Sequence, residues 1–172
     1  MVLKRYLILA VISVGMSAFI LTASSTEQLT DKQQSLSEIK ALYVFVQGLN
    51  AETAKAGLTR EKIETKVSNK LKQLNVKVVS EEEGLTLAGS PVLYVKVTAR
   101  KRERLSAFIF HVEVGLLQKV SLVREPRVQA MSITWNKGSL GYCSGDAFAE
   151  TIEGVVADLM EKFGSDYSSA NP

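Results

Sequence analysis

The chain has 172 residues, of which 46% are hydrophobic and 23% are charged, and its formal net charge is +3. These proportions lie near the average for globular proteins and exclude wholesale disorder and a collagen-like structure. A single His and a single Cys exclude a zinc finger, a histidine-rich metal site and a disulfide scaffold. We therefore expect no metal and no other cofactor.

The N-terminus has the three parts of a secretory signal. Lys4 and Arg5 precede an uncharged, largely apolar stretch, and the small residues Ala23–Ser25 close it. We interpret residues 1–25 as a cleaved signal peptide or, alternatively, as a membrane anchor that inserts through residues 6–23. The positive-inside rule keeps the basic start in the cytoplasm in both cases. We therefore expect the rest of the chain to be periplasmic, either free or facing the periplasm from the inner membrane.

The remaining chain divides into a linker and one domain. Residues 26–37 are polar and lack an apolar stripe, which predicts a linker before a single domain at 38–172. Outside the leader, 19 basic and 18 acidic side chains nearly balance, so we expect no nucleic-acid partner. The charge is uneven, because residues 26–142 carry 18 basic and 12 acidic side chains while residues 143–172 carry one and six. This asymmetry suits a helix packed across a basic sheet edge, or a dipolar surface for a partner.

The first half of the domain alternates strand and helix. A β-rich run within residues 39–49 predicts a strand, and residues 51–58 predict a loop. Thr59 is a good helix N-cap. Residues 76–79 predict a short strand, with residues 81–84 as its exit. The helix that follows Thr59 has an apolar stripe at spacings of four, four and three: Ile63, Val67, Leu71 and Leu74.

Three long strands and a helix form the second half. The β-rich runs at residues 91–99, 105–123 and 127–135 predict a meander. The turn between its first two strands is a basic hairpin tip: Arg100, Lys101, Arg102, Glu103 and Arg104. An amphipathic helix is predicted to begin near Gly145 or Asp146 and to carry one apolar stripe: Phe148, Ile152, Val155, Val156, Leu159, Phe163 and Tyr167.

The predicted element order is β-α-β-β-β-β-α. A strand–helix–strand unit implies a parallel crossover, whereas a meander is antiparallel. We therefore expect an α+β fold of two layers, in which a mixed sheet of about five strands carries two helices on one face.

One candidate site lies between the last strand and the last helix. Gly138, Gly141, Cys143 and Gly145 fall in a glycine-rich segment whose backbone N–H groups could bind an anion. The spacing of Gly141, Cys143 and Gly145 partly matches a nucleophile elbow with Cys in place of Ser. No His follows Cys143, and His111 lies upstream on a strand. We therefore favour a structural glycine turn that carries a buried Cys.

The basic hairpin tip is a second candidate site. Arg100, Lys101, Arg102 and Arg104 could contact phospholipid headgroups or an acidic partner. The same residues could instead form a solvated turn that keeps the strand ends soluble, and this interpretation is favoured.

A set of short sequences spreads over most of residues 38–172: Ala56-Gly57-Leu58-Thr59, Leu93-Tyr94-Val95, Thr134-Trp135, Gly138, Gly141, Phe163, Asp166-Tyr167 and Asn171-Pro172. The set resembles a family of small, largely uncharacterised secreted bacterial proteins that end in a helix and a Tyr…Asn-Pro tail. The element order is also loosely similar to periplasmic domains of the TolB N-terminal or penicillin-binding-protein-activator type. The likeness implies an accessory role at the cell envelope and assigns no catalytic residue.

We therefore expect an exported, non-enzymatic accessory domain that contacts a protein partner at the envelope. The expected contact surfaces are the basic tip and an exposed strand edge that accepts another strand. Three alternatives stay open at this point. The first is an accessory subunit of a membrane complex that keeps its N-terminal helix, the second is a thiol-dependent hydrolase with Cys143 as nucleophile, and the third is a carrier of a small ligand or lipid.

Overall fold

A computed structural model of the chain describes residues 28–102, 104 and 106–172. The predicted leader at 1–25, with its apolar stretch at 6–23, lies outside the described residues. Within the described part, none of the helices combines the length and the apolar character that a membrane span requires.

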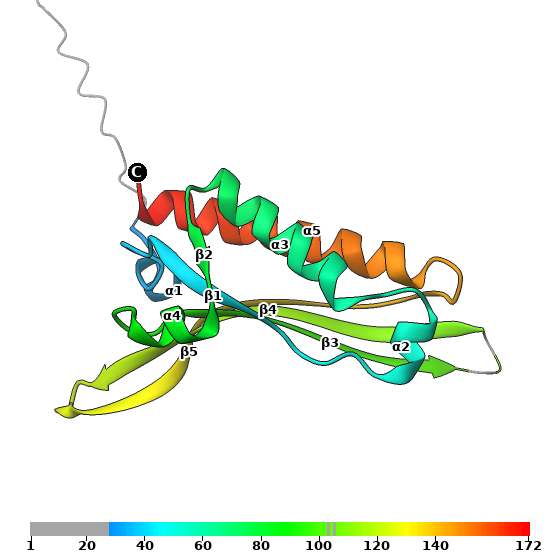
Figure 1. Cartoon of the computed structure of the whole chain (residues 1–172), viewed down its shortest axis with the longest axis horizontal. Coiled ribbons are helices and arrows are strands. Elements are labelled where there is room, and N and C mark those ends of the chain that lie inside the picture. Colours follow the sequence, from blue (N-terminus) through cyan, green and yellow to red (C-terminus); the bar gives the residue numbers. More distant parts are fainter. Residues whose placement is uncertain (1–27, 103, 105) are drawn as a thin grey trace, which may run out of the picture.

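A five-stranded mixed sheet is the centre of the fold (Figure 1). The strands stand in the order β2-β1-β3-β4-β5. Their bounds are Ala41–Val46 for β1, Lys77–Val79 for β2, Val92–Arg102 for β3, Ala107–Leu122 for β4 and Glu125–Ser144 for β5. β1 is parallel to both β2 and β3, whereas β3, β4 and β5 are antiparallel neighbours. The predicted α+β fold, with its parallel crossover and its antiparallel meander, is confirmed.

The two faces of the sheet differ in what covers them. Successive side chains of a strand point to opposite faces, and the even-numbered residues of the first part of β4 are buried: Phe108, Phe110, Val112, Val114 and Leu116. Helices α3 (Arg60–Gln73) and α5 (Phe148–Ala170) lie side by side over this inner face (Figure 1). The opposite, outer face carries the odd-numbered residues of the same part of β4.

Helix α3 forms as its sequence predicts. The Thr59 side chain accepts a hydrogen bond from the Lys62 backbone N–H at 3.3 Å, which caps the helix. Ile63, Val67 and Leu71 are fully buried against the sheet and α5. Helix α5 buries the predicted stripe in the same core, except for Val155, which is partly buried.

Two short helices occupy segments where the sequence predicts none. Helix α2 (Ala51–Lys55) lies in the expected loop, and α4 (Glu81–Thr86) replaces the expected strand exit. Each begins at a capping side chain, Asn50 or Ser80, that accepts a hydrogen bond from a backbone N–H three residues later. A local cap is enough to stabilise a single helical turn. These segments lack apolar periodicity, so the sequence pattern did not predict the two helices.

The expected linker at 26–37 is also part of the domain where the structure describes it. Helix α1 (Asp31–Gln34) begins with a capping box between Thr30 and Gln33. Leu36 follows and is completely buried in the core. One apolar residue in a polar segment gives no periodic signal, so the sequence pattern did not reveal this contact.

The predicted glycine turn is wrong, because β5 continues through it to Ser144. Gly138, Gly141 and Cys143 pair with Glu113, Phe110 and Phe108 of β4. A Cβ atom at Gly141 would lie 2.6 Å from Cζ of Phe110, so the glycine makes room for a core ring beside it. Gly141 therefore allows close packing within a strand and does not form a turn.

We expect that Gly141→Ala destabilises the fold by about 1–3 kcal/mol, because the added methyl group overlaps the Phe110 ring in the core. Gly154→Ala is the matched control. It lies inside α5 with no atom within 4 Å of the added Cβ, so it should stabilise the fold by about 0.5–1 kcal/mol. Urea unfolding followed by circular dichroism measures both changes. Unchanged stability in Gly141→Ala would contradict the extended β5.

Candidate interaction surface on the outer sheet face

Exposed apolar side chains gather on the outer face near the β3–β4 tip. Ile109 pairs with Tyr142 of β5 and with Arg100 of β3, so these three side chains form one row across the sheet. Leu140 lies in the next row, opposite His111. Leu140 and Tyr142 are 75% and 83% exposed, which is unusual for large apolar side chains.

Two shallow hollows lie on this part of the sheet. A hollow of about 400 Å³ is bounded by the following residues: Arg102, Ala107, Ile109, Leu140, Gly141 and Tyr142. A second hollow of about 220 Å³ adjoins it and is bounded in part by Arg100, His111 and Leu140. We call Arg100, Arg102, Ile109, Leu140 and Tyr142 the tip patch.

The structure divides the predicted basic tip between the two faces of the sheet. Arg100 and Arg102 lie in β3 on the outer face, beside the apolar side chains of the tip patch. Lys101 lies between them in the strand and therefore points to the opposite face. Arg104 lies in the turn beyond β3. Within the described part of the chain, neither Arg100 nor Arg102 forms an ion pair, so both charges remain available to an acidic group.

Cys143 and His111 lie on opposite faces of the sheet. Cys143 pairs with the buried Phe108 and packs partly buried against the core. His111 pairs with Leu140 on the outer face. Helix α5 begins at Phe148, beyond Gly145, and its start lacks a side-chain cap. The Cys143 thiol therefore stands neither at a helix N-terminus nor within reach of an imidazole in β4.

A polar network that sequence reasoning missed borders the tip patch. The Tyr94 hydroxyl donates to Glu113 Oε1 at 2.7 Å, and Asn136 Nδ2 donates to the same oxygen at 3.2 Å. The hydrogen bond from Tyr94 is the main cause that lowers the pKa of Glu113. Burial and the contact with Glu113 raise the pKa of Tyr94. Tyr94 crosses the sheet over Gly115, where a Cβ atom would lie 2.5 Å from the ring.

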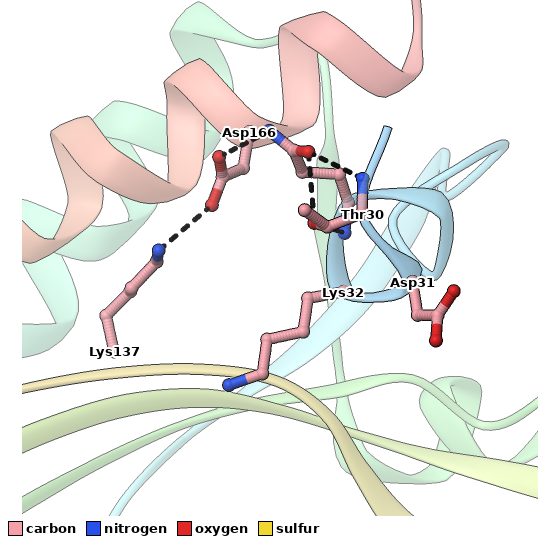
Figure 2. A pocket seen from close by; sticks show the side chains of 6 residues that line it. Thr30, Asp31, Lys32, Lys137 and Asp166 are labelled. Atoms are coloured by element: carbon pink, nitrogen blue, oxygen red, sulfur yellow. Dashed lines mark hydrogen bonds and ion pairs between the residues drawn. The ribbon is translucent and has the colours of Figure 1, made fainter. Parts of the chain in front are cut away.

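A second cluster ties the two ends of the domain together (Figure 2). The Asp166 carboxylate on α5 accepts a hydrogen bond from the Trp135 indole N–H at 2.9 Å and one from Gln33 Nε2 at 3.0 Å. Lys137 lies 3.7 Å from the same carboxylate, and Lys32 donates to Asn136 at 2.9 Å. An open hollow of about 430 Å³ lies beside these groups. We call the cluster the Asp166 junction.

The other residues of the C-terminal tail act at the same place. The Tyr167 hydroxyl donates to the Ile39 carbonyl at 2.8 Å. The Asn171 side chain accepts from the Glu38 backbone N–H at 2.8 Å and donates to the Leu36 carbonyl at 3.1 Å. The residues that carried the family resemblance at Trp135, Asp166, Tyr167 and Asn171 therefore fasten the segment before β1 to α5, which is a structural role.

The structure also bears on metal binding. Among residues 28–102, 104 and 106–172, no three His, Cys, Asp or Glu side chains stand close enough together to hold a metal ion.

Neither the known protein-family models nor the curated proteins provide a match for this chain. The resemblance to small secreted envelope proteins therefore stays a prediction.

We expect that Asp166→Ala lowers the free energy of unfolding by about 1–3 kcal/mol, because it leaves the buried Trp135 N–H without its acceptor. It should also speed amide hydrogen exchange near Gln33, since the hydrogen bond of its side chain to α5 is lost. Asp158→Ala is the matched control, because Asp158 lies exposed on the same helix. Equal stability of the two variants would show that Asp166 does not hold the junction together.

Proposed function

We propose that this chain is an exported, non-enzymatic accessory domain that binds a protein partner at the cell envelope through the tip patch. The observation that carries the proposal is the exposure of Ile109, Leu140 and Tyr142 together near the β3–β4 tip, on the part of the outer face away from α4, which packs against Tyr43 of β1. Exposed apolar groups with a polar rim are typical of protein-binding surfaces, and tyrosine and arginine are enriched in them.

Two further observations support a binding role. β5 stands at the edge of the sheet and pairs only with β4. Its first part joins the end of β4 in a two-stranded ribbon that extends away from α3 and α5 (Figure 1). An edge strand offers unpaired backbone groups to another chain. The ribbon also exposes apolar side chains: Val123, Val128, Met131 and Ile133.

The placement of the single cysteine argues against the thiol-dependent hydrolase. A cysteine nucleophile needs a base within hydrogen-bond reach, and Cys143 lies on the opposite face of the sheet from His111. Cys143 also packs against the core, which suits a small apolar side chain.

The Asp166 junction holds α1 against α5, so the predicted leader is only a few residues from the folded domain. This placement makes the anchored form a second candidate. Residues 26–30 alone separate the predicted leader from α1, and extended chain of that length spans about 17 Å. A retained leader would therefore hold the domain close to the membrane, where a membrane complex is within reach.

The mature N-terminus distinguishes the two forms. We expect sequencing of the protein purified from its host to begin at Thr26, because Ala23–Ser25 provide the small residues that signal peptidase requires. A chain that begins at Met1 or Val2 and sediments with membranes would support the anchored subunit instead.

A photoreactive side chain tests the binding role. We expect p-benzoyl-phenylalanine in place of Tyr142 to form a discrete crosslinked adduct with one protein in intact host cells, because this side chain is almost fully exposed in the tip patch. The same amino acid in place of Gln73, exposed at the end of α3, is the control and should form no such adduct.

Replacing Cys143 distinguishes the binding role from the thiol-dependent hydrolase. Cys143→Ala should leave the Tyr142 adduct unchanged, since the thiol lies on the other face of the sheet. The proposal is wrong if position 142 yields no protein adduct at native abundance, or if the purified chain turns over an ester or amide in a manner that requires Cys143.

A further inference from the structure

We infer that the element bound by the tip patch is an acidic amphipathic helix of the partner, which lies on the outer face as a third layer of the fold. This inference rests on the proposed function and specifies the partner's chemistry. It depends on the charge of the outer face, on the dimensions of the patch and on the position of its cations.

Three cations stand on one face of β3. Lys96, Arg100 and Arg102 are exposed and share the outer face, because they are separated by even numbers of residues. None of the three forms an ion pair within the described residues. Glu113 lies directly opposite Lys96 in the β3–β4 pair and partly offsets its charge, and it accepts hydrogen bonds from Tyr94 and Asn136. The part of the outer face at Arg100 and Arg102 is therefore net positive beside its apolar centre.

Two acidic residues of α5 are used on the inner side of the sheet. Glu153 of α5 lies 3.4 Å from Lys62 and 3.6 Å from Lys66 of α3, and Glu161 pairs with Lys70. These two glutamates of α5 thus balance three lysines of α3 on the inner side. The cations of β3 lie on the other side of the sheet, where an incoming acidic partner would balance them.

The dimensions of the patch suit a helix. From Lys96 to Arg102 the strand rises about 20 Å, which equals the length of a helix of roughly 14 residues. The three strands β3, β4 and β5 span about 10 Å from the first axis to the third, close to the diameter of a helix. A helix over β4 would cover Ile109 and contact Leu140 and Tyr142 with one apolar stripe.

The cations favour a helix on the face over a strand added to the edge of β5. An added strand would lie three strand spacings from β3, about 14 Å away. A helix above β4 lies next to the β3 row, so that Glu or Asp side chains on its flank reach Arg100 and Arg102. A helix over the tip patch also adds a third layer at this end of the sheet and buries the exposed apolar side chains.

The adduct formed at position 142 provides the test. Mass spectrometry of the crosslinked peptide should identify a segment of helical periodicity with excess Asp and Glu on its polar face. Combining the probe with Arg100→Glu and Arg102→Glu should lower the adduct yield about tenfold, because like charges then face each other. Lys162→Glu, an exposed cation on α5 on the opposite side of the sheet, is the matched control and should leave the yield unchanged.

The outcomes separate the inference from the proposed function. A protein adduct whose segment is basic, extended or indifferent to the charge reversals would overturn the acidic helix and leave the binding role standing. An adduct to phospholipid in place of protein would overturn both, as would the absence of any adduct. Circular dichroism of the purified Arg100→Glu/Arg102→Glu variant should match the wild type, which ensures that a lost adduct reflects the charge.

Discussion

The hydrogen bond between the Trp135 indole and the Asp166 carboxylate fixes how the parts of this domain meet. Trp135 is completely buried, and its ring packs edge-on against Phe163 with a centroid separation of 5.1 Å. A buried indole N–H without an acceptor is costly. Helix α5 must therefore lie where the Asp166 carboxylate reaches Trp135 of β5. The same carboxylate then receives Gln33, which brings the segment before β1 against α5. Once α5 is fixed, the inner face is covered, whereas the outer face carries α4 over β1 and stays open near the β3–β4 tip.

The elements with regular apolar periodicity were predictable from the sequence. Helix α3, helix α5 and the strand alternation of β4 each bury a stripe of matching period, because burial of that stripe determines the element. The segments whose structure was predicted wrongly have no such stripe. Leu36 is a lone apolar residue, and α4 depends on the cap at Ser80. The second half of β5 was mistaken for a turn because Gly141 and Gly138 accommodate Phe110 and His111 across the strand pair, a contact invisible without the register.

The candidate surface was predictable only in part. Arg100 and Arg102 stood out as a basic run, but their assignment to a face required the pairing of β3 with β4. Leu140 and Tyr142 gave no signal, because they alternate with Gly141 in a segment that resembled a loop. Tyr94, Glu113 and Asn136 come from three strands and meet only through the register. Sequence separation therefore hid both the apolar half of the patch and the polar network beside it.

The open part of the outer face, near the β3–β4 tip, reflects how charged and apolar side chains are distributed in the chain. Glu153 and Glu161 of the C-terminal helix pair with lysines of α3 on the inner side, whereas Lys96, Arg100 and Arg102 lie on the outer face of the sheet. A soluble domain that only needed to remain folded would place polar side chains opposite its helices, as one-sided antiparallel sheets commonly do. Here Ile109, Leu140 and Tyr142 interrupt that pattern beside Arg100 and Arg102, which form no ion pair with the residues that the structure describes. Because exposed apolar surface is unfavourable in water, these side chains support the proposal that another chain covers this part of the sheet.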